Sequence, residues 1–109
     1  MHLLRWQPEL IVNLPKGIGF SPYILPGSKE LTLTNAKFFN IHQLVVWAKH
    51  GVIACSENSI KHTVDYFKFV EACTHTEYLN LTLGEIGEDL PIENIRAFCI
   101  ALNIKQDIF

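Results

Sequence analysis

Histidine and cysteine are the residues of this sequence that most readily do chemistry, and their spacing argues against a metal site. A structural zinc site shows pairs at short spacing, such as CxxC or HxxxH, and only Cys73-Thr74-His75 comes near that pattern. His62 and Cys73 fall on one side of a predicted helix, but the rise of about 1.5 Å per residue separates them by about 16 Å. We therefore predict no metal and no cofactor. The residues considered are His2, His42, His50, His62, His75, Cys55, Cys73 and Cys99.

Sequence motifs for catalysis and phosphate binding are missing as well. There is no GxSxG, no HExxH and no DxD, and Gly17-Ile18-Gly19 is a bare GxG without a third glycine. With eleven acidic residues, five histidines and three cysteines, some catalytic triad can always be drawn, so drawing one proves nothing. We predict no catalytic residue, and an enzyme of unknown reaction is the last of our three functional hypotheses.

Thr82–Phe98 has the outline of a helix-turn-helix, with a short helix, a tight break and a second helix. Its apolar residues would hold the two helices together: Leu83, Ile86, Leu90, Ile92 and Ile95. The second helix, however, offers only Asn94 and Arg96 for base or phosphate contacts, and no basic cluster follows. A helical hairpin built for packing would look much the same. A DNA-binding regulator is therefore the second hypothesis.

Several apolar residues do not fit the inner stripe of the last predicted helix. Ile100 and Ile104 lie opposite that stripe, and Trp6 precedes a proline near the other end of the chain. Exposed apolar patches with aromatic anchors are typical of protein interfaces. We predict an interface made of Ile100, Ile104, Ile108, Phe109 and Trp6. The alternative is that the N-terminal segment covers these residues within the same domain.

The elements that must position these residues fall into two parts. Residues 1–34 hold four of the five prolines, so we expect extended segments there. Leu25-Pro26-Gly27-Ser28 predicts a type II turn, and Glu30–Thr34 alternates as a strand does. Together these patterns indicate a small β-hairpin or meander.

Residues 35–109 are predicted to be mainly helical. Asn35–Gly51 has apolar residues on two faces and a glycine at its end, which predicts a buried central helix. A second helix would begin after a Ser56 cap and end near Thr76, and a third would cover Pro91–Leu102. Thr82–Leu90 would form a short helix weakened by glycines. Val52–Cys55 is predicted to be a brief strand or a buried connector.

The composition limits the classes of function. The chain has 109 residues, 49% of them hydrophobic, and a net charge of −2, so we expect one folded domain and no general affinity for nucleic acid. The odd number of cysteines without CxxC indicates buried free thiols. The lack of a leader peptide and of an apolar run of about 20 residues indicates a cytoplasmic protein that does not span a membrane.

These observations lead to one expectation for the whole chain. The fold class is α+β, with an N-terminal hairpin or meander packed on three main helices plus one short helix. The leading function is a small non-catalytic regulator or adaptor that binds a protein partner, with a homodimer expected. DNA binding and enzymatic activity are the two alternatives.

Overall fold

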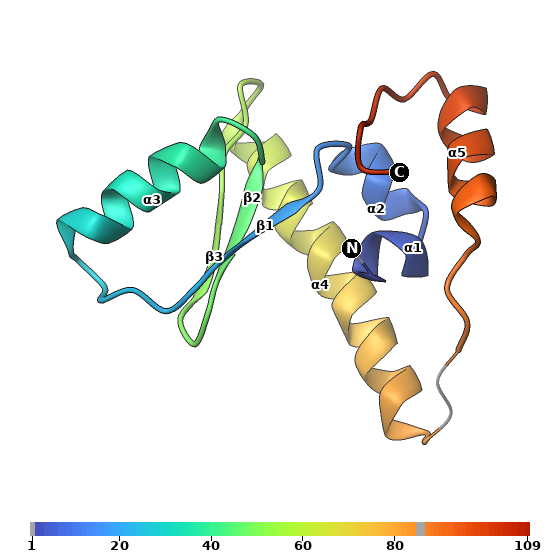
Figure 1. Cartoon of the computed structure of the whole chain (residues 1–109), viewed down its shortest axis with the longest axis horizontal. Coiled ribbons are helices and arrows are strands. Elements are labelled where there is room, and N and C mark those ends of the chain that lie inside the picture. Colours follow the sequence, from blue (N-terminus) through green and yellow to red (C-terminus); the bar gives the residue numbers. More distant parts are fainter. Residues whose placement is uncertain (1, 85–86) are drawn as a thin grey trace.

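Three short strands, β1 (Ile18–Ser21), β2 (Leu44–Trp47) and β3 (Gly51–Ala54), form a sheet in the order β1-β2-β3. This computed structural model describes residues 2–84 and 87–109 (Figure 1). β1 pairs with β2 in parallel, with Ile18 opposite Leu44. β2 and β3 are antiparallel and form a hairpin. The expected α+β fold class is confirmed. β1 lies in the N-terminal segment of residues 1–34, as expected, whereas β2 and β3 lie between residues 44 and 54, outside the predicted N-terminal hairpin or meander.

The predicted central helix over Asn35–Gly51 is wrong. Helix α3 covers Lys29–Phe39, so it includes the Glu30–Thr34 stretch that alternation had assigned to a strand. The chain then turns and enters β2, whose first two residues, Leu44 and Val45, are fully buried on opposite faces. An apolar run that is buried on both faces fits a central strand as well as a buried helix, and periodicity alone does not separate the two.

The N-terminal segment contains two short helices that the prolines had argued against. α1 covers His2–Trp6 and α2 covers Glu9–Asn13, with Pro8 immediately before α2. A proline at a helix start removes an N–H that has no partner within the helix, so it is tolerated there. The predicted turn is present, because Ser28 N donates to Leu25 O at 3.1 Å. Ser28 then caps α3 by accepting from Leu31 N.

Two longer helices complete the fold. α4 covers Ile60–Thr82, so it begins and ends later than predicted, and its cap is Ser59 instead of Ser56. α5 covers Ile92–Ala101, close to the predicted last helix. The short helix expected over 82–90 is not formed in its described part, since Thr82 ends α4 and residues 87–91 are not helical; residues 85–86 lie outside the described chain. The first helix of the predicted helix-turn-helix is therefore missing.

The core lies on the side of the sheet opposite to α3. One cluster joins α1, α2, the sheet and α4, and a second joins α2 and α5 (Figure 1). The first contains Leu4, Leu10, Leu14, Ile18, Leu44, Tyr66 and Cys73. The second contains Ile11, Ile95 and Cys99. Helix α3 covers the other face, where Phe38 approaches Gly19. Across the described residues, no helix is both long and apolar enough to span a bilayer.

Candidate active site at the tip of the hairpin

The carboxyl ends of β1 and β2 lie at the same edge of the sheet because the two strands are parallel. Ser21 pairs with Trp47 at the end of this register, and Ala48 N donates to Ser21 O at 3.1 Å just beyond it. In sheets with parallel strands, ligands bind beyond the carboxyl ends. The hairpin loop of residues 48–50, between β2 and β3, lies at this edge.

The backbone of this loop has an unusual conformation at Lys49. Its φ is +61°, a left-handed value that only one other non-glycine residue of the described chain adopts, Asn103. A lysine has no side-chain group that compensates this conformation locally, so the surrounding turn must hold it. His50 N donates to Trp47 O at 3.1 Å and closes the turn. Backbone strain of this kind is concentrated at functional sites, which makes the tip a candidate.

The imidazole of His50 is presented on an aromatic support. Its ring stacks on Trp47, with centroids 5.2 Å apart and an interplanar angle of 27°. Trp47 is itself held by α3, because its Nε1 donates to Asn35 Oδ1 at 2.7 Å. His50 remains exposed. An exposed imidazole in a fixed position can transfer protons or bind a metal ion, and both need such preorganisation.

The tip does not make a complete site within the described residues. Among them, no three His, Cys, Asp or Glu side chains come together as metal ligands would. A metal ion at the tip would therefore have His50 as one ligand and take its other ligands from elsewhere. The same holds for catalysis, which needs an acid or base, an orienting group and a charge stabiliser in one place.

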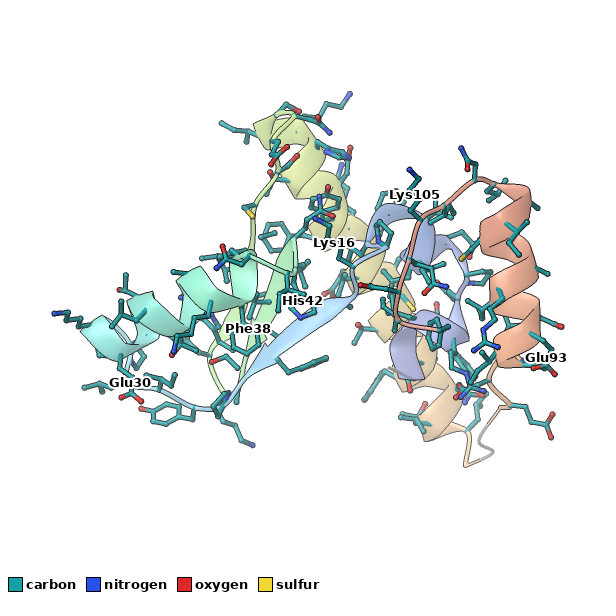
Figure 2. The ribbon with its side chains drawn as sticks, turned by 45° about the horizontal axis from the view of Figure 1, so that its top comes forward. Lys16, Glu30, Phe38, His42, Glu93 and Lys105 are labelled. Atoms are coloured by element: carbon teal, nitrogen blue, oxygen red, sulfur yellow. The ribbon has the colours of Figure 1, made fainter. Side chains whose placement is uncertain are left out.

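The other histidines in contact with described groups are held by the chain itself. His42 Nδ1 donates to Lys16 O at 2.9 Å, and its ring lies near Phe38 (Figure 2). His62 Nδ1 accepts from Asn58 Nδ2 at 2.9 Å at the start of α4. A hollow of about 150 Å³ lies beside His42 at the opposite edge of the sheet. The hollow is lined by both Lys16 and Glu57, so it favours neither an anionic nor a cationic ligand.

The cysteines are only partly as predicted. Cys73 and Cys99 are buried, whereas Cys55 is exposed. Burial, with smaller contributions from Glu77 and Glu9, raises the pKa of Cys73 to about 11. Burial also raises the pKa of Cys99. These two thiols are therefore protonated near neutral pH and have a packing role.

The structure places four of the five predicted interface residues in packing within the chain. Trp6, Ile108 and Phe109 pack against the first cluster, and Ile104 and Phe109 pack against the second. Ile100 is 81% exposed on α5. Packing within the chain thus accounts for four of the five residues. The interface stays a prediction, and of the five residues Ile100 is the one with an open surface for it.

The two predicted DNA-contacting residues do not form a reading face. Asn94 is exposed on α5, but Arg96 Nε donates to Phe109 O at 2.7 Å and so holds the last described residue. In the described residues, the first helix of the motif is not formed ahead of α5, and α5 packs on α2 instead. The DNA-binding reading therefore has no structural support.

His50 was missed at the sequence level because of the predicted central helix. Placed at a helix C-terminus, His50 and Gly51 looked like ordinary end signals. The signal that could have found the site is the pattern of two apolar runs, Leu44–Trp47 and Val52–Ala54, around a polar break with glycine. That pattern is typical of a hairpin.

The comparisons with known proteins point to sugar-phosphate aldolases. The chain is 43% identical over 108 residues to rhamnulose-1-phosphate aldolase of Bacteroides thetaiotaomicron, in an alignment covering 94% of this chain and 39% of the relative. It is 39% identical to rhamnulose-1-phosphate aldolase of Klebsiella pneumoniae subsp. pneumoniae, covering 94% of this chain and 37% of the relative. No protein-family model matches the sequence.

A solved structure agrees with the sequence matches. The sugar-phosphate aldolase of Thermotoga maritima superposes with a TM-score of 0.71 and 27% identity, over 78% of this chain and 36% of the other.

These findings correct the leading functional prediction. Relatives and a structural neighbour that are enzymes overturn the expectation of a non-catalytic regulator or adaptor, and with it the ranking of an enzyme as the last of the three hypotheses. Neither comparison supports a DNA-binding regulator. Across most of its length the chain is similar to rhamnulose-1-phosphate aldolases, and it spans less than two fifths of the length of the two described here.

Proposed function

We propose that this chain forms part of the catalytic domain of a sugar-phosphate aldolase and that His50 contacts the reacting substrate. The observation that carries the proposal is the 43% identity to a rhamnulose-1-phosphate aldolase, over 94% of the chain. An alignment of that extent includes the parallel strands and the hairpin tip. The strained Lys49 and the supported imidazole of His50 give the tip the geometry of a functional site.

The chemistry of an aldolase explains why an imidazole belongs there. Cleavage of the carbon–carbon bond requires that a base take the proton of a substrate hydroxyl while the bond breaks. The electron pair left on the other carbon must be stabilised by positive charge, which a metal ion or a protonated imine supplies. His50, exposed and fixed on Trp47, is placed either to transfer the proton or to act as one ligand of such an ion.

Self-association belongs to the same proposal. The homodimer predicted from the sequence fits the exposed Ile100 on α5, and light scattering of the purified chain would test it. The cytoplasmic location stays a prediction.

A chimera tests the proposed activity. The matched segment of the Bacteroides thetaiotaomicron aldolase, 39% of that protein, is replaced by this chain, and cleavage of rhamnulose 1-phosphate is followed by an enzyme-coupled assay. We expect an active chimera. His50→Ala should then lower kcat/KM by about 10²–10⁴-fold, the usual contribution of a proton-transferring group.

The control is His75→Ala, which removes an exposed histidine of α4 far along the chain from the tip. It should leave kcat/KM unchanged. Treatment of the chimera with a chelator separates the two roles of His50. Loss of activity that added divalent metal restores would indicate that His50 is a metal ligand. Unchanged activity after chelation, together with a shift in the pH profile of kcat/KM in His50→Ala, would indicate proton transfer. A folded but inactive chimera, or equal effects of the two substitutions, would contradict the proposal.

A further inference from the structure

One face of the sheet is covered at one end and bare at the other. Ile18 and Leu44 lie side by side across the two parallel strands and are 2% and 0% exposed, because α1, α2 and α4 pack on them. Two residues further along, on the same face, Phe20 is 55% exposed. Val52 of β3 is 42% exposed in the same row. We call Phe20, Val46 and Val52 the bare row.

The divergence of α4 from the sheet explains the difference. α4 begins near the covered end of the sheet, and the distance between α4 and the β2–β3 hairpin then grows toward the hairpin tip (Figure 1). A hollow of about 280 Å³ lies between them, lined by Val52, Phe67, Lys68, Val70 and Glu71. Its floor is apolar, and Lys68 and Glu71 give it a charged rim. A covered apolar centre with a charged rim is the usual anatomy of a protein interface.

Phe20 presents a large aromatic side chain that is more than half exposed on this face of the sheet. Val46 lies between Phe20 and Val52 and is only partly buried, so the apolar row crosses all three strands. The outer edges of β1 and β3 also carry no further strand among the described residues. The surface therefore lacks one layer of protein at the end of the sheet where the strands' carboxyl ends and His50 lie.

We propose that the bare row is the docking surface for polypeptide equivalent to the portion of the aldolase relatives that this chain does not span. That portion is about three fifths of the Bacteroides thetaiotaomicron protein, since the chain covers 39% of it. Its apolar side chains fill the hollow between Val52 and Phe67. Because the row leads to the hairpin tip, the same polypeptide brings the remaining catalytic groups to His50. The inference rests on the proposed function and names the partner of that site.

Co-expression tests the surface directly. The tagged chain is produced together with the part of the Bacteroides thetaiotaomicron aldolase outside the matched segment, and the amount captured on the tag is measured. We expect stable capture. The double variant Phe20→Ser, Val52→Thr should reduce it at least tenfold. Both residues are exposed in the free chain, so the variant should keep its circular dichroism spectrum and melting temperature.

Leu33→Ser is the matched control, because Leu33 is also 55% exposed but lies on α3, which covers the other face of the sheet. It should leave capture within twofold of the unchanged chain. No capture, or equal loss in both variants, would overturn the proposal. So would a dimer of the chain alone that the double variant abolishes, because the row would then bind a second copy.

The outcomes separate this inference from the proposed activity. Capture that depends on the bare row, together with an inactive chimera, would contradict the activity and leave the surface intact. An active chimera without capture of the separate segment would contradict the surface alone.

Discussion

Gly19 shows how a single position sets the distance between a helix and the sheet. It lies in β1 beneath α3, and a Cβ added there would meet His42 Cδ2 at 3.0 Å, Phe38 Cδ1 at 3.1 Å and Val45 Cγ2 at 3.3 Å. The His42 ring cannot easily move aside, because its Nδ1 donates a hydrogen bond to Lys16 O. The missing side chain therefore lets α3 pack closely on the strands.

Gly19→Ala should lower the free energy of unfolding by about 1–3 kcal/mol, the usual cost of overpacking. Gly51→Ala is the control, since an added Cβ there meets nothing within 4 Å. It should change stability by less than about 0.5 kcal/mol. Urea unfolding followed by circular dichroism measures both. Equal effects would show that α3 can move to accommodate a side chain.

Cys73 links stability to alkaline pH. Burial raises the pKa of its thiol from 9.0 to about 11 in the folded protein. Between these values the unfolded state has lost the proton and the folded state still binds it, so stability falls as pH rises from about 9 to 11. Cys73→Ala should therefore show a shallower loss of unfolding free energy over this range than the unchanged chain. Identical slopes in denaturant unfolding at several pH values would contradict this.

At the scale of an element, α4 depends on its first turn. Ser59 has extended backbone angles, and its side chain accepts a hydrogen bond from His62 N at 3.0 Å. This bond satisfies one of the amide groups that a helix leaves without a partner at its start. Since α4 carries Tyr66 and Cys73 into the main cluster, weakening its start affects the core.

Ser59→Ala should lower the free energy of unfolding by about 1 kcal/mol, because the capping acceptor is lost. Ser59→Asp keeps an acceptor and adds negative charge at the positive end of the helix dipole, so it should keep the original stability. Thermal unfolding of the two variants measures the difference. A loss in both would assign another role to the serine.

At the scale of the whole molecule, the two ends of the chain tie the clusters together. Leu90 N donates to Arg5 O, and Arg5 Nε donates to Leu90 O, each at 3.1 Å. Phe109 packs against both clusters, and Arg96 holds its carbonyl oxygen. Segments distant in sequence therefore share one core.

Phe109→Ala should lower the free energy of unfolding by about 1–3 kcal/mol, because a side chain packed on two clusters is removed. Ile100→Ala, at an 81% exposed position, should change it by less than about 0.5 kcal/mol. Denaturant unfolding and sedimentation, run together, measure folding and association. Weaker association at unchanged stability in Phe109→Ala would instead support the interface predicted from the sequence.

Local patterns in the sequence determined several elements of this protein. Helical spacing and Pro91 located α5, and Pro26-Gly27 located the turn before α3. The α+β class also followed from the sequence. In each case the signal lies within a few residues, so neighbours along the chain are sufficient to read it.

Only the tertiary structure decided that Leu44–Trp47 is a strand and that His50 lies at a candidate active site. The apolar run has the composition of either element, and pairing with β1 on one side and β3 on the other selects the strand. His50 then reaches the edge of the sheet near Ser21, which is far away in sequence. That proximity depends on a parallel pairing whose hydrogen bonds and burial exist only in the folded chain, so no local pattern could reveal it.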